Sequence, residues 1–315
     1  MTSARPLRPL GSTGLTVSPV TLGGAPLGGM PENFGYDVSE RDAIDLVRAV
    51  LDSDIRTIDT SNGYSHGRSE ERIGRGIEEY GGLPGDVVVI TKVDPHGDDF
   101  SGDRVVRSLA ESTERLGVAP FPLVHLHDPE FYDFDELTKP GGAIDALVAA
   151  RERGEIEHLG LAGGNVHEMA RYLELGVFEV LLVHNRWTLV DRSAGPLFRR
   201  AAELGVATMN AAVLGGGILA DASRSITQYG YRPASPETLA AIQGMRELCR
   251  RWDTDLATAA IRFSTRDPAV ASTIIGISKV SRIETTITSA TVELPEDFWS
   301  EIESLVPAPA NWLDA

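Results

Sequence analysis

The chain has 315 residues, of which 42% are hydrophobic and 24% are charged, and its formal net charge is −17. So acidic a chain repels the phosphate backbone of nucleic acids and anionic lipid surfaces, and we expect neither as a partner. No apolar run approaches the roughly 18 residues of a membrane-spanning helix, and the single cysteine, Cys249, excludes an intrachain disulfide. These features predict a cytoplasmic protein.

The first patterned segment is RPLGSTGLTVSPV at residues 8–20. Two short apolar stretches flank a Gly-Ser-Thr-Gly turn, which is typical of a β-hairpin. We expect this N-terminal hairpin to close the bottom of the domain that follows.

From residue 20 onward, short β-branched runs alternate with amphipathic segments. The apolar residues of the amphipathic segments recur at three- and four-residue spacing, which indicates helices, and Gly117, Gly176 and Gly205 are expected to end three of them. Eight strands, each followed by a helix, predict an α/β fold, a closed (β/α)8 TIM barrel forming one domain over residues 1–315. The expected strands lie at 20–24, 57–60, 87–93, 123–127, 158–163, 179–185, 207–212 and 271–276, and the clearest helices at 39–53, 101–117, 141–155, 165–176 and 193–205.

One stretch breaks this alternation. Residues 221–237, DASRSITQYGYRPASPE, have no periodicity and include Tyr229 and Tyr231. We interpret the stretch as a long loop after the seventh strand that lies over the pocket of the barrel, since long unpatterned loops in compact domains are usually functional.

Polar side chains follow three consecutive strands at the point where each strand ends. They are Asp59 and Tyr64 after the second strand, Lys92 on the third and His127 on the fourth. The active sites of such barrels form at the carboxyl ends of the strands, so these side chains are expected to meet. A lysine ammonium beside a tyrosine hydroxyl favours the phenolate, a carboxylate can hold that lysine charged, and a histidine can donate to a carbonyl oxygen. The set therefore predicts a tyrosine acid/base, tuned by Lys92, with His127 beside it.

Other chemistries for the same residues stay open. Lys92 could form a Schiff base, although this leaves the spacing of Asp59 and Tyr64 unexplained. His125 and His127 alternate around Leu126 and therefore share a face, so they could bind a divalent metal together with Asp94, His96 or His184. For His125 we favour a simpler interpretation, an inward polar residue that is satisfied within the barrel.

The order of these motifs resembles the aldo-keto reductases over nearly the whole chain. The resemblance is carried by R-LG-TGL-VS at 8–18, DT-xxx-Y at 59–64, TK at 91–92 and HDP at 127–129. Finer segments, LVHLHDPE, WTLVDR and YGYRPASPE, resemble the branch that contains D-threo-aldose 1-dehydrogenase (L-fucose dehydrogenase), L-galactose dehydrogenase and a pyridoxal dehydrogenase. The resemblance implies a (β/α)8 barrel that binds NAD or NADP, with Tyr64 as general acid/base, Lys92 and Asp59 tuning it, and His127 orienting the carbonyl.

The resemblance also implies cofactor contacts, although several positions depart from the family pattern. Only Asn165 of the GLAGGN segment could supply the usual carboxamide grip, and His184 or Asn185 stands at the usual glutamine. The aromatic that usually stacks on nicotinamide is replaced by alanine, which leaves Leu214 or Trp187 for that face. Arg282 matches a residue that often contacts the 2′-phosphate, which favours NADP. The residues assigned to the cofactor are Gly24, Asn165, His184, Asn185, Leu214, Gly276, Ser278, Lys279 and Arg282.

We therefore expect an NAD(P)-dependent oxidoreductase acting on an aldose-like hemiacetal or a small aldehyde. Trp187, Tyr229 and Tyr231 are expected to contact this substrate, although Trp187 could equally belong to the lid or the core. No metal is assigned in this interpretation. The alternatives are a nicotinamide-binding regulatory subunit without turnover and a metal-dependent hydrolase on the same scaffold.

Overall fold

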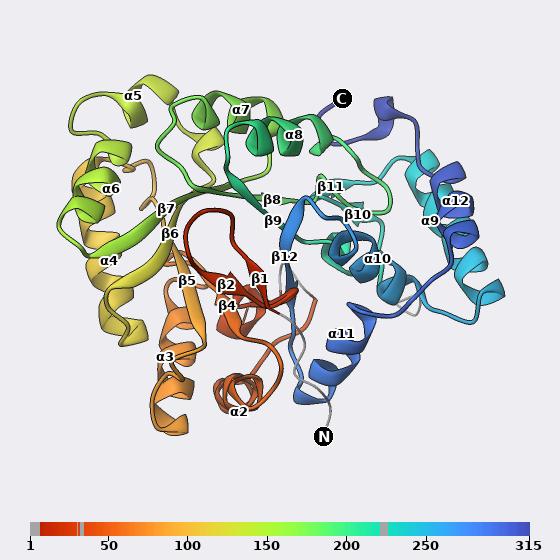
Figure 1. Ribbon diagram of the computed structural model, residues 1–315, viewed down its shortest axis with the longest axis horizontal. Coiled ribbons are helices and arrows are strands. Elements are labelled where there is room, and N and C mark those ends of the chain that lie inside the picture. Colours follow the sequence, from red (N-terminus) through yellow and green to blue (C-terminus); the bar gives the residue numbers. More distant parts are fainter. Residues whose placement is uncertain (1–6, 30, 32–34, 221–225) are drawn as a thin grey trace.

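Eight parallel strands close into a barrel in the computed structural model, as the alternating pattern predicts (Figure 1). The structure describes residues 7–29, 31, 35–220 and 226–315. Each strand pairs with its neighbour in the chain, and the last strand closes the barrel by pairing with the first. The strands are β3 (Val20–Gly23), β4 (Thr57–Asp59), β5 (Val88–Val93), β6 (Phe121–His127), β7 (Ile156–Gly163), β8 (Val180–His184), β9 (Ala207–Ala211) and β12 (Val270–Gly276).

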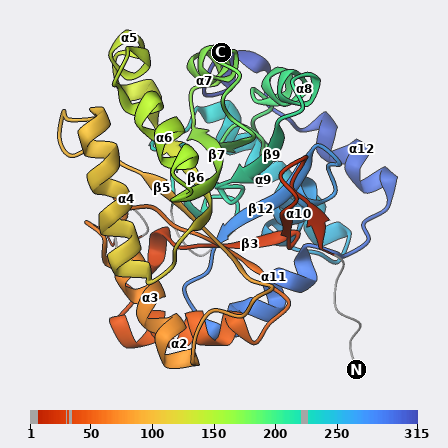
Figure 2. The same ribbon diagram turned by 60° about the vertical axis from the view of Figure 1, so that its left-hand side comes forward.

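Helices follow these strands and form the outer layer. Figure 2 shows α2, α3 and α4 along one flank, where consecutive helices contact each other. Gly117, Gly176 and Gly205 all adopt positive φ just past a helix, as expected of C-terminal stops. The helices are α2 (Glu40–Leu51), α3 (Arg68–Tyr80), α4 (Gly102–Leu116), α5 (Phe134–Thr138), α6 (Ala143–Glu152), α7 (Val166–Leu173), α8 (Gly195–Glu203), α9 (Pro236–Arg251), α10 (Leu256–Thr265), α11 (Ile283–Ser289) and α12 (Glu296–Ser304).

The predicted N-terminal hairpin is present and packs onto the interior of the barrel. Strands β1 (Arg8–Pro9) and β2 (Thr16–Val17) pair antiparallel, in front of the barrel strands in Figure 1. Leu10 and Val17 are fully buried and belong to the same apolar cluster as inward residues of β5, β6 and β9. The hairpin therefore closes one end of the barrel, and the other end is left for a site.

The stretch 221–237 is less irregular than expected. Residues 221–225 lie outside the described residues, but β10 (Gln228–Tyr229) and β11 (Arg232–Pro233) form a short antiparallel hairpin. A loop with no periodic pattern gives no signal for so short a pairing, which the turn at Gly230 and Tyr231, both with positive φ, makes possible.

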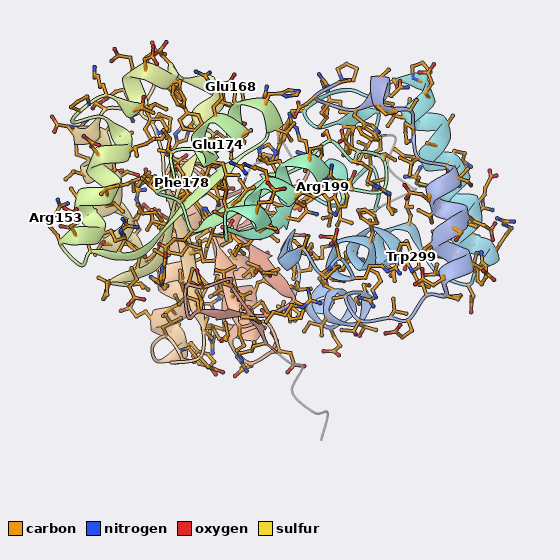
Figure 3. The ribbon with its side chains drawn as sticks, turned by 45° about the horizontal axis from the view of Figure 1, so that its top comes forward. Arg153, Glu168, Glu174, Phe178, Arg199 and Trp299 are labelled. Carbon is orange, nitrogen blue, oxygen red and sulfur yellow. The ribbon has the colours of Figure 1, made fainter. Side chains whose placement is uncertain are left out.

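The outer surface is strongly polar. Figure 3 labels Arg153, Glu174 and Arg199, which are exposed around α6, α7 and α8, whereas Phe178 is buried just before β8. Trp299 of α12 is 7% exposed and lies under the guanidinium of Arg266. Within the described part of the chain, no helix has the length and apolar character needed to cross a bilayer.

Close approach of α3 to the end of α4 requires a glycine. A Cβ atom at Gly74 would overlap the backbone carbonyl oxygen of Arg115, which cannot move as a flexible side chain can. Gly74→Ala should therefore destabilise the protein by about 2 kcal/mol, even though alanine gains about 1 kcal/mol of helix propensity.

The midpoint of urea unfolding measures this effect. Gly85→Ala is the matched control, because a Cβ there meets no atom within 4 Å and the variant should unfold like the wild type. Equal stability of the Gly74→Ala variant would contradict the close packing of these two helices.

Candidate active site

The four residues predicted to form the site are brought together at the carboxyl ends of adjacent strands. Asp59 ends β4, Lys92 lies near the end of β5 and His127 ends β6, and these strands pair in that order. Tyr64 lies in the loop that follows β4, and its ring contacts the imidazole of His127 edge to face at 5.6 Å. The expected meeting of these side chains is therefore present in the structure.

A buried ion pair lies at the centre of this group. The Nζ atom of Lys92 is 2.6 Å from Oδ1 of Asp59, and the two side chains are only 1% and 3% exposed. The same nitrogen donates to the carbonyl oxygen of Thr60 at 2.7 Å and to the hydroxyl oxygen of Tyr64 at 3.3 Å. An ammonium has three protons, so these three acceptors use all of them. Because Lys92 donates to the Tyr64 oxygen, the phenolic proton is left to point elsewhere.

The expected acidity of Tyr64 is wrong for the protein without cofactor. Burial raises the pKa of Tyr64 well above its ordinary value, and the negative charges of Asp59 and Asp128 raise it further. Lys92 does not reverse this, because Asp59 lies against the same ammonium and offsets its charge. The tyrosine is therefore a protonated acid at neutral pH, which the strand pattern did not reveal.

His127 has a carboxylate partner that the sequence interpretation considered only as a metal ligand. Oδ1 of Asp94 is 2.6 Å from Nδ1 of His127, and the hydroxyl of Ser61 lies 3.0 Å from the same nitrogen. Asp94 comes two residues after Lys92, and the twofold period of an extended chain puts such residues on one face. That spacing is the signal that could have found it.

The loop that carries Tyr64 is braced by α4. Arg104 donates to Oδ1 of Asn62 at 2.8 Å and to both carboxylate oxygens of Glu111, while Asn62 donates to the carbonyl oxygen of Ser108. The hydrogen bonds from Arg104 lower the pKa of Glu111 to about 2. Nothing in the chain order connects these positions, so this brace was not predicted.

Two of the predicted cofactor residues are restricted by local backbone contacts. The amide of Gly24 donates to the carbonyl oxygen of Asp59 at 2.7 Å, and a Cβ at Gly24 would come within 2.9 Å of that oxygen. Asn165 is the N-cap of α7, where its side-chain oxygen accepts from two backbone amides. Helix capping uses this oxygen, so only the amide nitrogen of Asn165 is left for the expected carboxamide grip, which stays a prediction.

His184 and Asn185 lie together at the end of β8. Nε2 of His184 is 3.5 Å from Oδ1 of Asp128, and Nδ1 is 3.2 Å from the side-chain nitrogen of Asn185. Asn185 is buried and adopts a positive φ of 62°, a conformation that asparagine tolerates better than most residues. Both remain candidates for contacts with the nicotinamide end of a cofactor.

The segment after β12 is an exposed turn with two free cations. Gly276 ends β12, and the side chains of Lys279 and Arg282 are exposed and have no ion-pair partner among the described residues. A Cβ at Gly276 would come within 3.0 Å of Pro26, so the backbone here lies close to the loop after β3. Ser278 is half-buried in the same turn, and Leu214 is half-buried after β9. These five positions are compatible with the predicted binding of a dinucleotide.

Two of the three predicted substrate residues are engaged in packing. The indole nitrogen of Trp187 donates to Asp267 at 2.9 Å, and its ring packs between Phe198 of α8 and Phe263 of α10. The assignment of Trp187 to the substrate is therefore wrong, as is its alternative role against the nicotinamide, because its ring belongs to the helical layer.

The two tyrosines of the β10–β11 hairpin differ from each other. Tyr229 is 5% exposed, and its hydroxyl contacts Thr188 at 2.7 Å and the carbonyl oxygen of Asn185 at 2.5 Å, so its assignment to the substrate is also wrong. Tyr231 is 75% exposed, and its ring lies in a T-shaped arrangement with that of His184, with 6.2 Å between the ring centroids. It therefore remains at the rim of the site.

Among the described residues, neither His125 nor His127 belongs to a group of three or more side chains spaced to hold a metal ion. His125 is fully buried inside the barrel, and burial holds its pKa well below the ordinary value. The backbone of Leu161 on the neighbouring strand β7 contacts the ring, so the interpretation of His125 as an inward polar residue satisfied within the barrel stays a prediction. The ligand atoms of Asp128, Glu130 and His184 do lie within 4.8 Å of one another, but such acidic groups are also common in proteins without an ion.

The chain is similar over nearly its whole length to proteins of known families. Residues 19–307 match the model of the aldo/keto reductase family. The chain is 29% identical to L-galactose dehydrogenase of Arabidopsis thaliana (97% of this chain and 95% of that protein) and 30% identical to pyridoxal 4-dehydrogenase of Microbacterium luteolum (94% and 96%). It is 27% identical to D-threo-aldose 1-dehydrogenase of a Pseudomonas species (95% and 97%).

The fold is also similar to a solved structure. Aldo-keto reductase AKR11C1 from Bacillus halodurans, in its holo form, superposes with a TM-score of 0.77 at 19% identity and covers 98% of both chains. At that identity the likeness supports the barrel fold alone.

Removal of Lys92 tests the buried pair. Lys92→Met leaves Asp59 without its counter-charge, and breaking one partner of a buried pair costs about 3–5 kcal/mol at neutral pH. Burial raises the pKa of Asp59 above its ordinary value, and the charge of Lys92 offsets part of this increase. Because Lys92→Met removes the offset, the substitution raises the pKa of Asp59 further. A carboxyl group with a raised pKa in the folded state favours folding at low pH, where it is protonated. The loss of stability in Lys92→Met should therefore shrink as the pH falls from neutral toward about 4, the pKa of aspartate in the unfolded chain.

Denaturant unfolding at two pH values measures both effects. Lys139→Met, which removes an exposed lysine of a surface pair with Glu136, is the control and should cause no measurable change. A Lys92→Met variant as stable as the control at neutral pH would disprove the buried pair.

Proposed function

Because the chain belongs to the aldo/keto reductase family, whose members are NAD(P)-dependent oxidoreductases, we propose that Tyr64 is its general acid/base and that its substrate is an aldose-like hemiacetal or a small aldehyde. The observation that carries the proposal is the triple contact of Lys92 with Asp59, Thr60 and the Tyr64 oxygen. Neither a regulatory subunit without turnover nor a metal-dependent hydrolase is favoured by these relatives.

The chain has groups that fit the dinucleotide. Lys279 and Arg282 are exposed cations beside the turn after β12, on a protein whose net charge is otherwise strongly negative, and they suit the phosphates. His184 and Asn185 suit the carboxamide at the other end. When bound, NAD(P) would supply or remove the hydride, and its oxidised ring would carry a positive charge.

In the reductive direction, the protonated Tyr64 donates its proton to the carbonyl oxygen as the carbonyl carbon gains hydride. Lys92 stabilises the phenolate that remains, since its ammonium is already in contact with the hydroxyl oxygen. In the oxidative direction the same oxygen accepts the proton of the C1 hydroxyl of a hemiacetal while C1 loses hydride, and the product is a lactone. The burial of Asp59 and Lys92 keeps water from screening this charge.

The mouth of the site supports a hydroxyl-rich substrate. Oε2 of Glu130 is a buried atom without a hydrogen-bond partner among the described residues, and Oδ1 of Asp128 has Nε2 of His184 at 3.5 Å; each oxygen can accept from a hydroxyl. These carboxylates also disfavour anionic substrates. Two of the relatives carry the names of sugar dehydrogenases and one that of a pyridoxal dehydrogenase, which supports neutral aldoses first and pyridoxal second.

Removal of one hydroxyl tests the role of Tyr64. Tyr64→Phe should lower kcat by about 10²–10⁴-fold, the usual contribution of general acid/base catalysis, and leave dinucleotide binding unchanged. The measurement is the change in nicotinamide absorbance with aldoses, pyridoxal and simple aldehydes. Tyr80→Phe removes a hydroxyl that contacts Asp52 on the surface and should keep full activity. Wild-type-like turnover by Tyr64→Phe would remove Tyr64 from the chemistry.

The choice of cofactor rests on Arg282. We propose that its guanidinium contacts the 2′-phosphate, so Arg282→Ala should weaken NADPH binding by about 10–100-fold, the value of one charged hydrogen bond, and leave NADH binding unchanged. Titration calorimetry with both dinucleotides checks this. Arg250→Ala, which removes an exposed arginine from α9, controls for net charge. An equal loss for both dinucleotides, or none, would contradict the preference for NADP.

A further inference from the structure

Asp94 is a buried carboxylate that the proposed proton transfer does not use. It follows β5 directly, is 7% exposed, and contacts His127 through Oδ1 at 2.6 Å. Its other oxygen accepts from the backbone amide of Gly63 at 2.7 Å and from the hydroxyl of Ser61. A carboxylate with three donors around it is fixed in place and stays ionised.

The hydrogen bond from His127 to Asp94 decides which protons the imidazole carries. An ionised carboxylate only accepts, so Nδ1 of His127 must be the donor. If the ring were neutral, its single proton would lie on Nδ1 and Nε2 would be bare, unable to donate to a substrate oxygen. His127 can donate from Nε2 only when both nitrogens are protonated. Nε2 lies 3.8 Å from Oδ1 of Asp128, beyond hydrogen-bond distance, so it is left for another acceptor.

Charged groups face this imidazole from three directions. Lys92 faces it from β5 and Asp94 from the position just after β5, Asp128 from the loop after β6, and Asp59 and Tyr64 from β4 and its loop. Burial lowers the pKa of His127, but the negative charges of Asp128 and Asp94 outweigh burial and raise it above the ordinary value. The charge of His127 in turn helps to lower the pKa of Asp94 despite the burial of that carboxyl. The two groups therefore stabilise each other as an ion pair.

We propose that Asp94 is a positioning residue that holds His127 as an imidazolium, so that Nε2 donates a hydrogen bond to the oxygen that receives the proton of Tyr64. The inference rests on the proposed function for its catalytic meaning, but the pairing and protonation of the imidazole do not depend on turnover. Asp94 therefore pairs with His127 in the same way as Asp59 pairs with Lys92.

Histidine ¹⁵N NMR of the dinucleotide-free protein tests the pairing directly. The resonances of His127, assigned by their loss in His127→Gln, should report both nitrogens protonated near neutral pH in the wild type. In Asp94→Asn the pKa of His127 should fall by about 1 or more, the usual effect of removing an adjacent opposite charge. Asp98→Asn, which removes an exposed carboxylate from the same loop, should leave the resonances unchanged.

Kinetics then separate positioning from damage to the fold. In the reductive direction, kcat falls at alkaline pH as His127 loses its proton. In Asp94→Asn this fall should begin about 1 pH unit lower, so that kcat at pH values above it is about tenfold smaller than in the wild type. Activity should return as the pH is lowered, because the imidazole regains its proton, whereas a misfolded site would not recover. Dinucleotide binding should stay at the wild-type value.

The outcomes distinguish the two proposals. A neutral His127 near neutral pH in the wild type, or an unchanged pKa in Asp94→Asn, would overturn the role of Asp94 even in an active enzyme. An absence of NAD(P)-dependent turnover in the wild type would instead overturn the proposed function, and the NMR result would still decide the pairing of Asp94 with His127.

Discussion

The buried ion pair of Lys92 and Asp59 is the constraint on which the site depends. A lysine with 1% exposure cannot remain charged without a partner, and Asp59 at 2.6 Å provides it. Both side chains come from the ends of paired strands, so the register of β4 and β5 sets their distance. The closed barrel fixes that register. The N-terminal hairpin closes the opposite end of the barrel, so the polar groups gather at the carboxyl ends of the strands. The Tyr64 oxygen then receives the third proton of the ammonium.

The site contains two pairs of the same kind, each made of a nitrogen donor and a buried carboxylate. Lys92 and His127 each contact a buried carboxylate, Asp59 and Asp94 respectively. Each carboxylate is buried, so water screens the pairs little, and each pair costs less free energy than an isolated charge would. Tyr64 lies between the two donors with its proton retained by burial. In the reaction that we propose, Tyr64 supplies the transferable proton, His127 donates to the substrate oxygen from Nε2, and Lys92 stabilises the phenolate.

Strand periodicity and strand order were sufficient to predict the barrel, the hairpin and the meeting of Asp59, Tyr64, Lys92 and His127, because parallel strands bring their ends to one rim. The errors share a physical cause, since each depends on a partner far away in the chain. Trp187 packs against Phe263 and Tyr229 contacts Thr188, and no local pattern reveals such neighbours. The high pKa of Tyr64 follows from burial and surrounding carboxylates, which spacing does not measure. The capping role of Asn165 is a different case, because its place before an amphipathic segment is a local signal that the sequence already contains.

The protonation state of Tyr64 tests the central claim most directly. With tyrosine labelled at ¹³Cζ and Tyr64 assigned by its loss in Tyr64→Phe, a pH titration of the dinucleotide-free protein reports phenol or phenolate at this one residue. The structure predicts that Tyr64 remains a phenol up to at least about pH 10, the ordinary tyrosine pKa. A phenolate already present near neutral pH would contradict the account, because it would mean that Lys92, and not burial with the surrounding carboxylates, controls the proton.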